Sequence, residues 1–537
     1  MPQPRIILSI FLLVFSSQNL YAAACPEKNT LNPKSRILSN PWGSELINSR
    51  FQSSENAGIN AKDVPRLKLK WAYYLPPRFP GTSELRSQPA VTEDTLYLGA
   101  QDSNLYALDT ETGCTRWTYE HDIQVRSGVV LGDIGSNGSR MVFFGDDNGF
   151  VTALDANTGK SLWKTEMDSH PNALITAAPT LYKDQLYVSV SSLEVVSAMN
   201  PFYNCCTFRG SVARVDALTG KIIWQTYSAP KSEKAGTNKL GVQMWGPSGA
   251  PIWNTPSIDA KRNALYAGTG ENYSSPASKG SDSILAIDLD SGKLLWEKQL
   301  TSGDAWNMSC TLPGKLNCPK EDGFDLDVGA NTILYHLNDD SDLVIAGQKS
   351  GIVWALDPDK NGAVVWKSKV GRGGALGGIH WGIGSDDRYI YAPNSDYELS
   401  LFNIIEARRP PGEKSPSLNA LDPKTGKIAW KYTEKFNCPD PDDCDDGFSA
   451  PPSIIPGVVF AGTMLGKLYA FNRDSGAVIW EYDTTQSVMT ISGDEGHGGS
   501  IDVDGAVIAG GQLYIHSGYG KMGKDGNVLL VFSIDGK

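Results

Sequence analysis

The sequence predicts an all-β protein, an eight-bladed β-propeller whose ring closes by pairing of its N- and C-terminal strands. Three observations favour this fold: a phrase that ends in tryptophan recurs along the chain, 55 glycines supply many turns, and part of one more copy stands near each end. A chain of 537 residues has room for three or four ordinary domains, but a closed repeat protein of this size is a single unit.

Each copy consists of an apolar residue, Asp or Asn, a few polar residues, Gly, and then Trp. This order is typical of a β-hairpin, because Asp and Gly favour the turn and the indole stands in the second strand. Another pair of strand-like runs precedes each copy, which gives four short strands per unit. The seven complete copies span residues 107–117, 153–163, 214–224, 286–296, 355–366, 420–430 and 470–480.

The two ends of the chain supply an eighth copy in two pieces. Residues 529–536 contain a strand and the turn without a tryptophan, whereas residues 67–71 contain the tryptophan strand without the turn. Pairing these pieces in one blade closes the ring and removes the exposed sheet edges. We therefore assign residues 66–537 to the propeller and residues 25–65 to an N-terminal extension, and expect eight of the 14 tryptophans to dock blades.

The first 24 residues are typical of an export signal. Arg5 precedes the apolar run 6–15, and small residues precede Cys25. The run is too short for a membrane-spanning helix, so we expect a periplasmic or secreted mature chain without a transmembrane segment. Lipid attachment at Cys25 is disfavoured, because Ala22 stands where such motifs carry a large aliphatic residue.

Eight cysteines remain after cleavage, and an even number in an exported chain predicts disulfide bonds. Two pairs would close short loops, one pair is adjacent in the sequence, and the remaining two cysteines are left to pair with each other. The expected bonds are Cys25–Cys114, Cys205–Cys206, Cys310–Cys318 and Cys438–Cys444. An adjacent pair forms a small strained ring that crosslinks a chain poorly, although two buried thiols are the alternative.

The charge balance excludes several classes of function. With 48 basic and 60 acidic residues the formal net charge is -12, which disfavours binding to nucleic acid or to anionic lipid. The sequence contains no GxSxG nucleophile elbow, no P-loop and no GxGxxG dinucleotide fingerprint. It also contains no CxxCH motif for a covalently bound haem.

Beyond the repeat, residues 40–537 resemble the quinoprotein alcohol dehydrogenases, which use pyrroloquinoline quinone (PQQ), and in particular their polyvinyl alcohol dehydrogenase branch. The resemblance implies oxidation of secondary alcohols, polyols or polyvinyl alcohol-like substrates. It also implies a Ca²⁺ or lanthanide ion, and transfer of electrons to an external cytochrome c or another acceptor, which would present a basic face to this acidic chain. The segments that carry it are Asn204–Gly210, Gly268–Ser274, Asp304–Asn307 and Leu376–Gly382.

The same resemblance implies a set of cofactor contacts. Cys205–Cys206 would lie over one face of the quinone and Trp253 would stack on the other, although the cysteine pair stands in a later loop than in the methanol-oxidising branch. Arg86 replaces a glutamate of that branch. The remaining implied contacts are Arg126 and Thr176 for the carboxylates, Lys349 for the quinone oxygens, and Trp381 from another blade.

The resemblance further implies a metal site and a general base. Asp325 corresponds to the base, with Asp304 as the alternative, and Lys349 assists catalysis. Asp327 stands where lanthanide users carry an additional aspartate, which leaves Ca²⁺ and a lanthanide both open. The implied metal ligands are Glu194, either Glu271 or Asn272, Asp325 and Asp327.

A non-catalytic propeller that scaffolds envelope proteins is the alternative function, because it would share the repeat. The repeat does not explain adjacent cysteines together with Glu194, Asp325 and Lys349 in one chain. We therefore expect an oxidoreductase.

Overall fold

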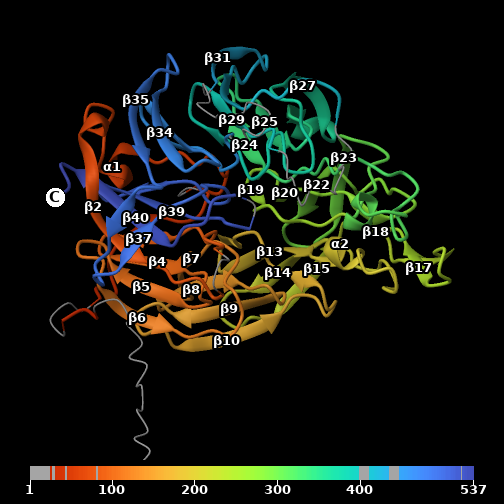
Figure 1. Ribbon diagram of the computed structural model, residues 1–537, viewed down its shortest axis with the longest axis horizontal. Coiled ribbons are helices and arrows are strands. Elements are labelled where there is room, and N and C mark those ends of the chain that lie inside the picture. The colour runs from red at the N-terminus through yellow and green to blue at the C-terminus, as the bar shows by residue number, and fades with distance from the viewer. Residues whose placement is uncertain are drawn as a thin grey trace, which may run out of the picture.

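The structure is a computed structural model that describes residues 24–26, 31–42, 45–79, 83–397, 410–433, 447–521 and 523–537. Most of the predicted export signal and the predicted Cys438–Cys444 bond lie outside the described residues. Eight antiparallel sheets form a ring, which confirms the predicted propeller (Figure 1). Among the described residues, none of the helices has both the length and the apolar character needed to span a bilayer.

Each blade runs from an innermost strand to an outermost strand, and the chain visits the blades in order around the ring. The first blade also carries β1 (Ile37–Ser39) beside its innermost strand. The first blade consists of β3 (Ala90–Thr92), β4 (Thr95–Gly99), β5 (Leu105–Asp109) and β6 (Thr115–Tyr119), and the second of β7 (Val130–Ile134), β8 (Ser139–Gly145), β9 (Phe150–Asp155) and β10 (Ser161–Glu166). The third consists of β12 (Thr180–Tyr182), β13 (Gln185–Ser192), β14 (Ser211–Asp216) and β15 (Ile222–Tyr227), and the fourth of β19 (Ser257–Asp259), β20 (Ala264–Gly268), β22 (Ser283–Asp288) and β23 (Leu294–Gln299).

The last blade takes its outermost strand from near the N-terminus and its other strands from the C-terminus. The fifth blade consists of β24 (Ile333–His336), β25 (Asp342–Gln348), β26 (Ile352–Asp357) and β27 (Ala363–Lys369), and the sixth of β28 (Gly384–Ser385), β29 (Ile390–Asn394), β30 (Ser417–Leu421) and β31 (Ile428–Tyr432). The seventh consists of β32 (Ser453–Ile455), β33 (Val458–Gly462), β34 (Lys467–Asn472) and β35 (Val478–Asp483), and the eighth of β38 (Val507–Ala509), β39 (Gln512–Ser517), β40 (Val528–Ile534) and β2 (Leu67–Tyr74).

Short elements decorate the ring. Strand β11 (Ala173–Leu174) extends the third blade, and three small pairs are β16 (Glu233–Thr237) with β17 (Gln243–Gly246), β18 (Ser248–Gly249) with β21 (Asn272–Ser274), and β36 (Ser487–Met489) with β37 (Glu495–His497). The helices are α1 (Ser54–Ala57) and α2 (Glu194–Ser197), with 3-10 turns η1 (Val64–Arg66), η2 (Met308–Thr311) and η3 (Pro358–Lys360).

The repeat tryptophans join neighbouring blades. Trp224, on the outermost strand of the third blade, packs on Gly292 in the fourth, and its indole N–H donates to the carbonyl of Leu289 at 3.1 Å. A Cβ on Gly292 would lie only 2.6 Å from the indole, so the position requires glycine. The same indole-to-carbonyl bond joins Trp71 to Thr110, Trp117 to Ala156, Trp163 to Ala217, Trp366 to Pro423, Trp430 to Arg473 and Trp480 to Leu67.

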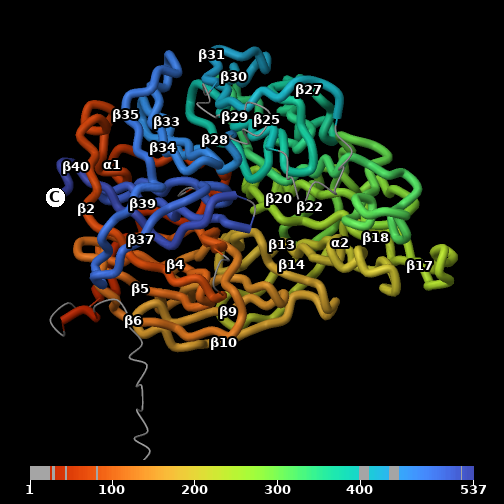
Figure 2. The backbone as a smooth tube through the Cα atoms, viewed as in Figure 1, coloured from red at the N-terminus to blue at the C-terminus, as the bar shows by residue number. Residues whose placement is uncertain are grey.

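The ring closes as predicted. Strands β2 and β40 pair antiparallel over their lengths, with Trp71 opposite Val531, and lie side by side at the left of Figure 2. The predicted bonds Cys25–Cys114, Cys205–Cys206 and Cys310–Cys318 are confirmed. The first of these fixes the start of the described chain to the first blade.

Residues 46–52, which we call the axial segment, run along innermost strands of the ring. Their hydrogen bonds reach the innermost strands of five consecutive blades, so this part of the N-terminal extension belongs to the propeller core. Its buried Arg50 donates to the carbonyls of Pro452 and Asp504, and burial lowers the pKa of Arg50 to about 9. The five contacts join Leu46 to Ile258, Ile47 to Leu334, Ser49 to Ser385, and Gln52 to both Ile454 and Ile508.

The blade contacts lead to a stability prediction. Gly292 and Gly138 both have left-handed backbones, with φ of 69° and 61°, but a Cβ on Gly138 meets nothing within 4 Å. Substitution of either glycine by alanine costs about 1 kcal/mol for the backbone, and Gly292→Ala adds about 1–3 kcal/mol for the clash with Trp224. We expect calorimetry to show a clearly lower unfolding midpoint for Gly292→Ala than for the control Gly138→Ala; equal midpoints would contradict the docking role of Trp224.

Candidate active site

A cavity of about 470 Å³ lies where the segments before the innermost strands converge. Because each blade presents this segment at the same position of the repeat, residues far apart in the sequence meet there. Other lining residues stand after the second strand of a blade, including Glu271 after β20, Lys349 after β25 and Tyr519 after β39. The lining residues that stand before an innermost strand include Arg86, Arg126, Thr176, Trp253, Asp325, Asp327, Trp381 and Asp502.

Three buried carboxylates form a cluster on the cavity wall. One oxygen from each of Glu271, Asp325 and Asp327 lies within 4.8 Å of the others. The ammonium of Lys349 lies 2.8 Å from Oδ1 of Asp325 and 2.9 Å from Oδ2 of Asp327. Hard oxygen ligands in this number fit Ca²⁺ or a trivalent lanthanide ion.

Burial and charge divide the cluster into different protonation states. Burial raises the pKa of Asp325 to about 8, against the opposing effect of Lys349. Burial also disfavours the charge of Asp327, but Lys349 and hydrogen bonds from Glu271 outweigh it and lower the pKa of Asp327 to about 2. Burial, together with the charges of Asp327 and Asp325, raises the pKa of Glu271 well above its usual value. Asp325 is therefore the member of the cluster poised to exchange a proton near neutral pH.

The backbone at Asp325 is held in an uncommon conformation. Its φ of 59° lies in the left-handed region, which costs free energy for a residue other than glycine. The carboxylate of Asp304 accepts the N–H groups of Phe324 at 3.0 Å and Leu326 at 2.7 Å. Asp304, the alternative base, does not line the cavity, and its carboxylate holds the backbone on either side of Asp325.

Aromatic side chains form the wall beside the carboxylates. The Trp253 indole N–H donates to Oδ2 of Asp327 at 3.0 Å, and its ring lies 5.0 Å from that of Trp381 at an interplanar angle of 76°. A Cβ on Gly329 would stand 1.9 Å from the Trp253 ring, so glycine leaves room for the indole. Burial lowers the pKa of His380 well below its usual value, which keeps this neighbouring ring neutral.

The cavity also contains a buried cation without a hydrogen-bond partner. The three guanidinium nitrogens of Arg86 make no hydrogen bond to any described residue, and the group packs 5.0 Å from the centre of the Tyr519 ring. Arg126 donates from Nε to Oγ1 of Thr176 at 3.0 Å. Nη1 of Arg86 lies 3.7 Å from Oε2 of Glu84, an ion pair too long for a hydrogen bond. A buried guanidinium without a hydrogen-bond partner fits an anionic ligand, and PQQ carries carboxylates of this kind.

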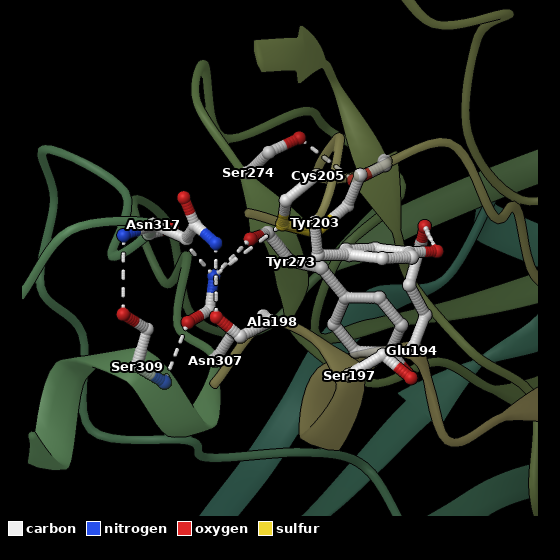
Figure 3. The surroundings of a disulfide bond; sticks show 12 residues. Glu194, Ser197, Ala198, Tyr203, Cys205, Tyr273, Ser274, Asn307, Ser309 and Asn317 are labelled. Atoms are coloured by element: carbon white, nitrogen blue, oxygen red, sulfur yellow. Dashed lines mark hydrogen bonds between the residues drawn. A yellow bond between two sulfur atoms is a disulfide. The ribbon is translucent and has the colours of Figure 1, made fainter. Parts of the chain in front are cut away.

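Several predicted site residues do not line the cavity. Glu194 is fully buried, and its carboxylate accepts a hydrogen bond from the Tyr203 hydroxyl at 2.9 Å (Figure 3). It also accepts the N–H groups of Thr207 and Phe208, each at 2.9 Å. Its oxygens are thus satisfied within the protein, in contrast to the expectation of a metal ligand. Asn272 likewise bonds Ser248 and Ser278, so the structure places Glu271, and not Asn272, at the carboxylate cluster.

The Cys205–Cys206 bond also differs from expectation. Both cysteines are fully buried in a core cluster and do not line the cavity, contrary to a place over the quinone. Asn307, which precedes η2, lies with Nδ2 3.9 Å from Sγ of Cys205 (Figure 3). The loop turns inward because Glu194 binds the backbone just after the pair and thereby anchors it.

The residues of the cavity wall that the sequence analysis did not name include Asp502, Tyr519 and Tyr273. Asp502 precedes the innermost strand β38 as Asp327 precedes β24, so its position in the repeat was the available signal. Burial raises the pKa of Asp502 to about 6. Tyr519 and Tyr273 stand after second strands and carry no distinctive motif.

Comparisons with known proteins agree with this geometry. Residues 40–370 match the family model for the glucose/ethanol/alcohol dehydrogenase β-propeller domain, which uses PQQ, and residues 414–535 match that for outer membrane protein assembly factor BamB. A polyvinylalcohol dehydrogenase of a Pseudomonas species is 37% identical over 93% of this chain and 77% of its own. One from Sphingopyxis sp. strain 113P3 is 38% identical over 93% of this chain and 76% of its own.

Solved structures show the same fold. The quinohemoprotein alcohol dehydrogenase of Comamonas testosteroni has a TM-score of 0.66 at 21% identity, covering 93% of this chain and 81% of that one. A europium-containing methanol dehydrogenase has a TM-score of 0.63 at 19% identity, covering 92% and 98%. With a family model over more than half of its length and two relatives above 30% identity, the chain belongs to the PQQ-dependent alcohol dehydrogenase family.

Proposed function

We propose that this alcohol dehydrogenase oxidises secondary alcohols, including polyols and polyvinyl alcohol-like chains, to carbonyl compounds with PQQ and a Ca²⁺ or lanthanide ion. The observation that carries the proposal is the buried group of Glu271, Asp325, Asp327 and Lys349 on the wall of a cavity. The same cavity holds Arg86, whose guanidinium has no hydrogen-bond partner among the described residues. The two relatives named polyvinylalcohol dehydrogenases favour this substrate class.

Different residues of the cavity would bind the cofactor and the metal ion. Arg86, Arg126 and Thr176 would hold the carboxylates of PQQ, and the indole of Trp253 would pack on its flat ring system. Glu271, Asp325 and Asp327 would hold the metal ion. When bound, PQQ supplies the two-electron redox chemistry and the metal ion supplies a Lewis acid.

Side chains of the protein accept the proton of the alcohol and stabilise the negative charge that develops. The Asp325 carboxylate takes the hydroxyl proton of the alcohol, for which its place on the cavity wall beside Lys349 is suited. The Lys349 ammonium stabilises negative charge that develops in this buried site. Asp304 keeps Asp325 in place through the N–H groups on either side of it.

We further propose that the enzyme works in the periplasm and passes electrons to a cytochrome c or another external acceptor. The export-like N-terminus favours this location. Because the chain has a formal net charge of -12, the complementary acceptor presents a basic face.

The alternative of a non-catalytic scaffold draws on the match to BamB. That match spans residues 414–535 and includes neither the carboxylates Glu271, Asp325 and Asp327 nor Lys349. It therefore reports the shared blade repeat and does not account for the cavity.

Reconstitution tests the function directly. The purified mature chain, mixed with PQQ and either Ca²⁺ or La³⁺, should acquire the absorption band of the bound quinone and reduce an electron-accepting dye with 2-butanol or 1,3-diols. PQQ alone, each metal alone and a BamB-type propeller serve as controls. A chain that gains neither the band nor the activity with any of these metals would favour the scaffold.

The assignment of the base predicts the effect of Asp325→Asn. Loss of the proton acceptor should lower kcat by about 10²- to 10⁴-fold, while circular dichroism and the unfolding midpoint show a folded chain. Asp322→Asn, in the same loop but ion-paired with Lys315, should keep full activity. Near-normal turnover by Asp325→Asn would refute its role as the base.

The Arg86 guanidinium, which has no hydrogen-bond partner among the described residues, predicts the effect of Arg86→Met. Because a charge-assisted hydrogen bond to the cofactor is lost, the Kd for PQQ measured by fluorescence quenching should rise about tenfold to hundredfold. Arg388→Met, which removes a half-exposed surface arginine, is the control. An unchanged Kd in Arg86→Met would show that Arg86 does not bind the cofactor.

A further inference from the structure

The Lys349 ammonium stands at the carboxylate cluster as a cation would. It lies 2.8 Å from Oδ1 of Asp325 and 2.9 Å from Oδ2 of Asp327, and its side chain is only 7% exposed. Its backbone N–H also donates to the carbonyl of Asp327 at 2.9 Å, so lysine and aspartate are fixed to each other at two points. The ammonium is therefore part of the cluster in the metal-free chain.

Oδ2 of Asp327 is fully used by this arrangement. Oδ1 accepts the backbone N–H of Glu271 at 2.7 Å, and Oδ2 accepts both the Trp253 indole and Lys349. The Glu271 side chain also hydrogen-bonds Asp327. A metal ion that binds Oδ2 must therefore replace one of the two contacts of that oxygen. Since the Trp253 ring is wedged against Gly329, the lysine is the contact that can move.

Electrostatics requires the same exchange. Buried carboxylates without a cation are strongly unfavourable, and Lys349 offsets this cost when no metal is present. A divalent or trivalent ion coordinated by the same carboxylates would stand within a few ångströms of the ammonium, where like charges repel strongly in a buried site. The ammonium and the metal ion therefore compete for the same carboxylates.

We propose that Lys349 is a built-in counter-ion, which holds the metal site together in the metal-free chain and is displaced toward the cavity when the ion binds. This rests on the proposed function, because it takes Glu271, Asp325 and Asp327 as the metal ligands. The flexible four-carbon stem of lysine allows the movement, and Lys349 already borders the cavity. Metal binding then delivers the ammonium to the substrate side of the site.

Terbium luminescence tests the exchange without any turnover. Tb³⁺ binds oxygen sites, and excitation of Trp253, whose indole contacts Asp327, should sensitise its emission. In the full mature chain free of PQQ and metal, we expect Lys349→Met to bind Tb³⁺ about tenfold or more tightly than the wild type, because the competing charge is gone. Its unfolding midpoint without metal should fall below that of the wild type and recover when Tb³⁺ or Ca²⁺ is added.

Two variants complete the experiment. Lys367→Met is the matched control, since its ammonium also lies 5.3 Å from an indole centre, that of Trp354, but on the surface. Lys349→Arg keeps the charge and offers a bidentate fork, so it should bind Tb³⁺ more weakly than the wild type and remains informative if Lys349→Met does not fold.

Equal or weaker Tb³⁺ binding by Lys349→Met, or equal or tighter binding by Lys349→Arg, would overturn the counter-ion role alone. A wild-type chain that binds no Tb³⁺ and no Ca²⁺ at any concentration would overturn the metal assignment as well.

Discussion

The contact between a tryptophan of one blade and a glycine of the next is the interaction on which the rest of this structure depends. The indole fills space that only glycine leaves and donates a hydrogen bond to a backbone carbonyl of the neighbouring blade. Repeated around the ring, this contact fixes the rotation of each blade relative to the next. The segments before the innermost strands consequently point to one place, and the catalytic cavity is the result.

The fold was predictable from sequence because its determinants are local. The Asp, Gly and Trp of each copy specify a hairpin and its docking without reference to distant residues, and the two half copies at the ends specify closure. Several residues that the family resemblance implied do line the cavity: Asp325, Asp327 and Trp253 precede innermost strands, and Lys349 follows a second strand. Their position in the blade places them at the cavity.

Residues of the insertions could not be placed in this way. Glu194 and Cys205–Cys206 lie between β13 and β14, where the chain leaves the repeat. Their path depends on contacts between segments distant in the sequence, such as Asn307 with Cys205 and Asn317 with the backbone of Ala198 and Asn200 (Figure 3). The family resemblance implied a metal ligand and a cofactor contact, but in the structure all three side chains are buried and do not line the cavity.

The axial segment bears on how substrate and electron acceptor reach the enzyme. Because residues 46–52 bond to the innermost strands of five blades, their backbone lines the inside of this part of the ring. In the proposed reaction, alcohol and electron acceptor both meet the enzyme at the cavity. A bulky polymer substrate and a protein acceptor would then occupy this face in turn, so that reduction and reoxidation of the enzyme alternate as separate encounters.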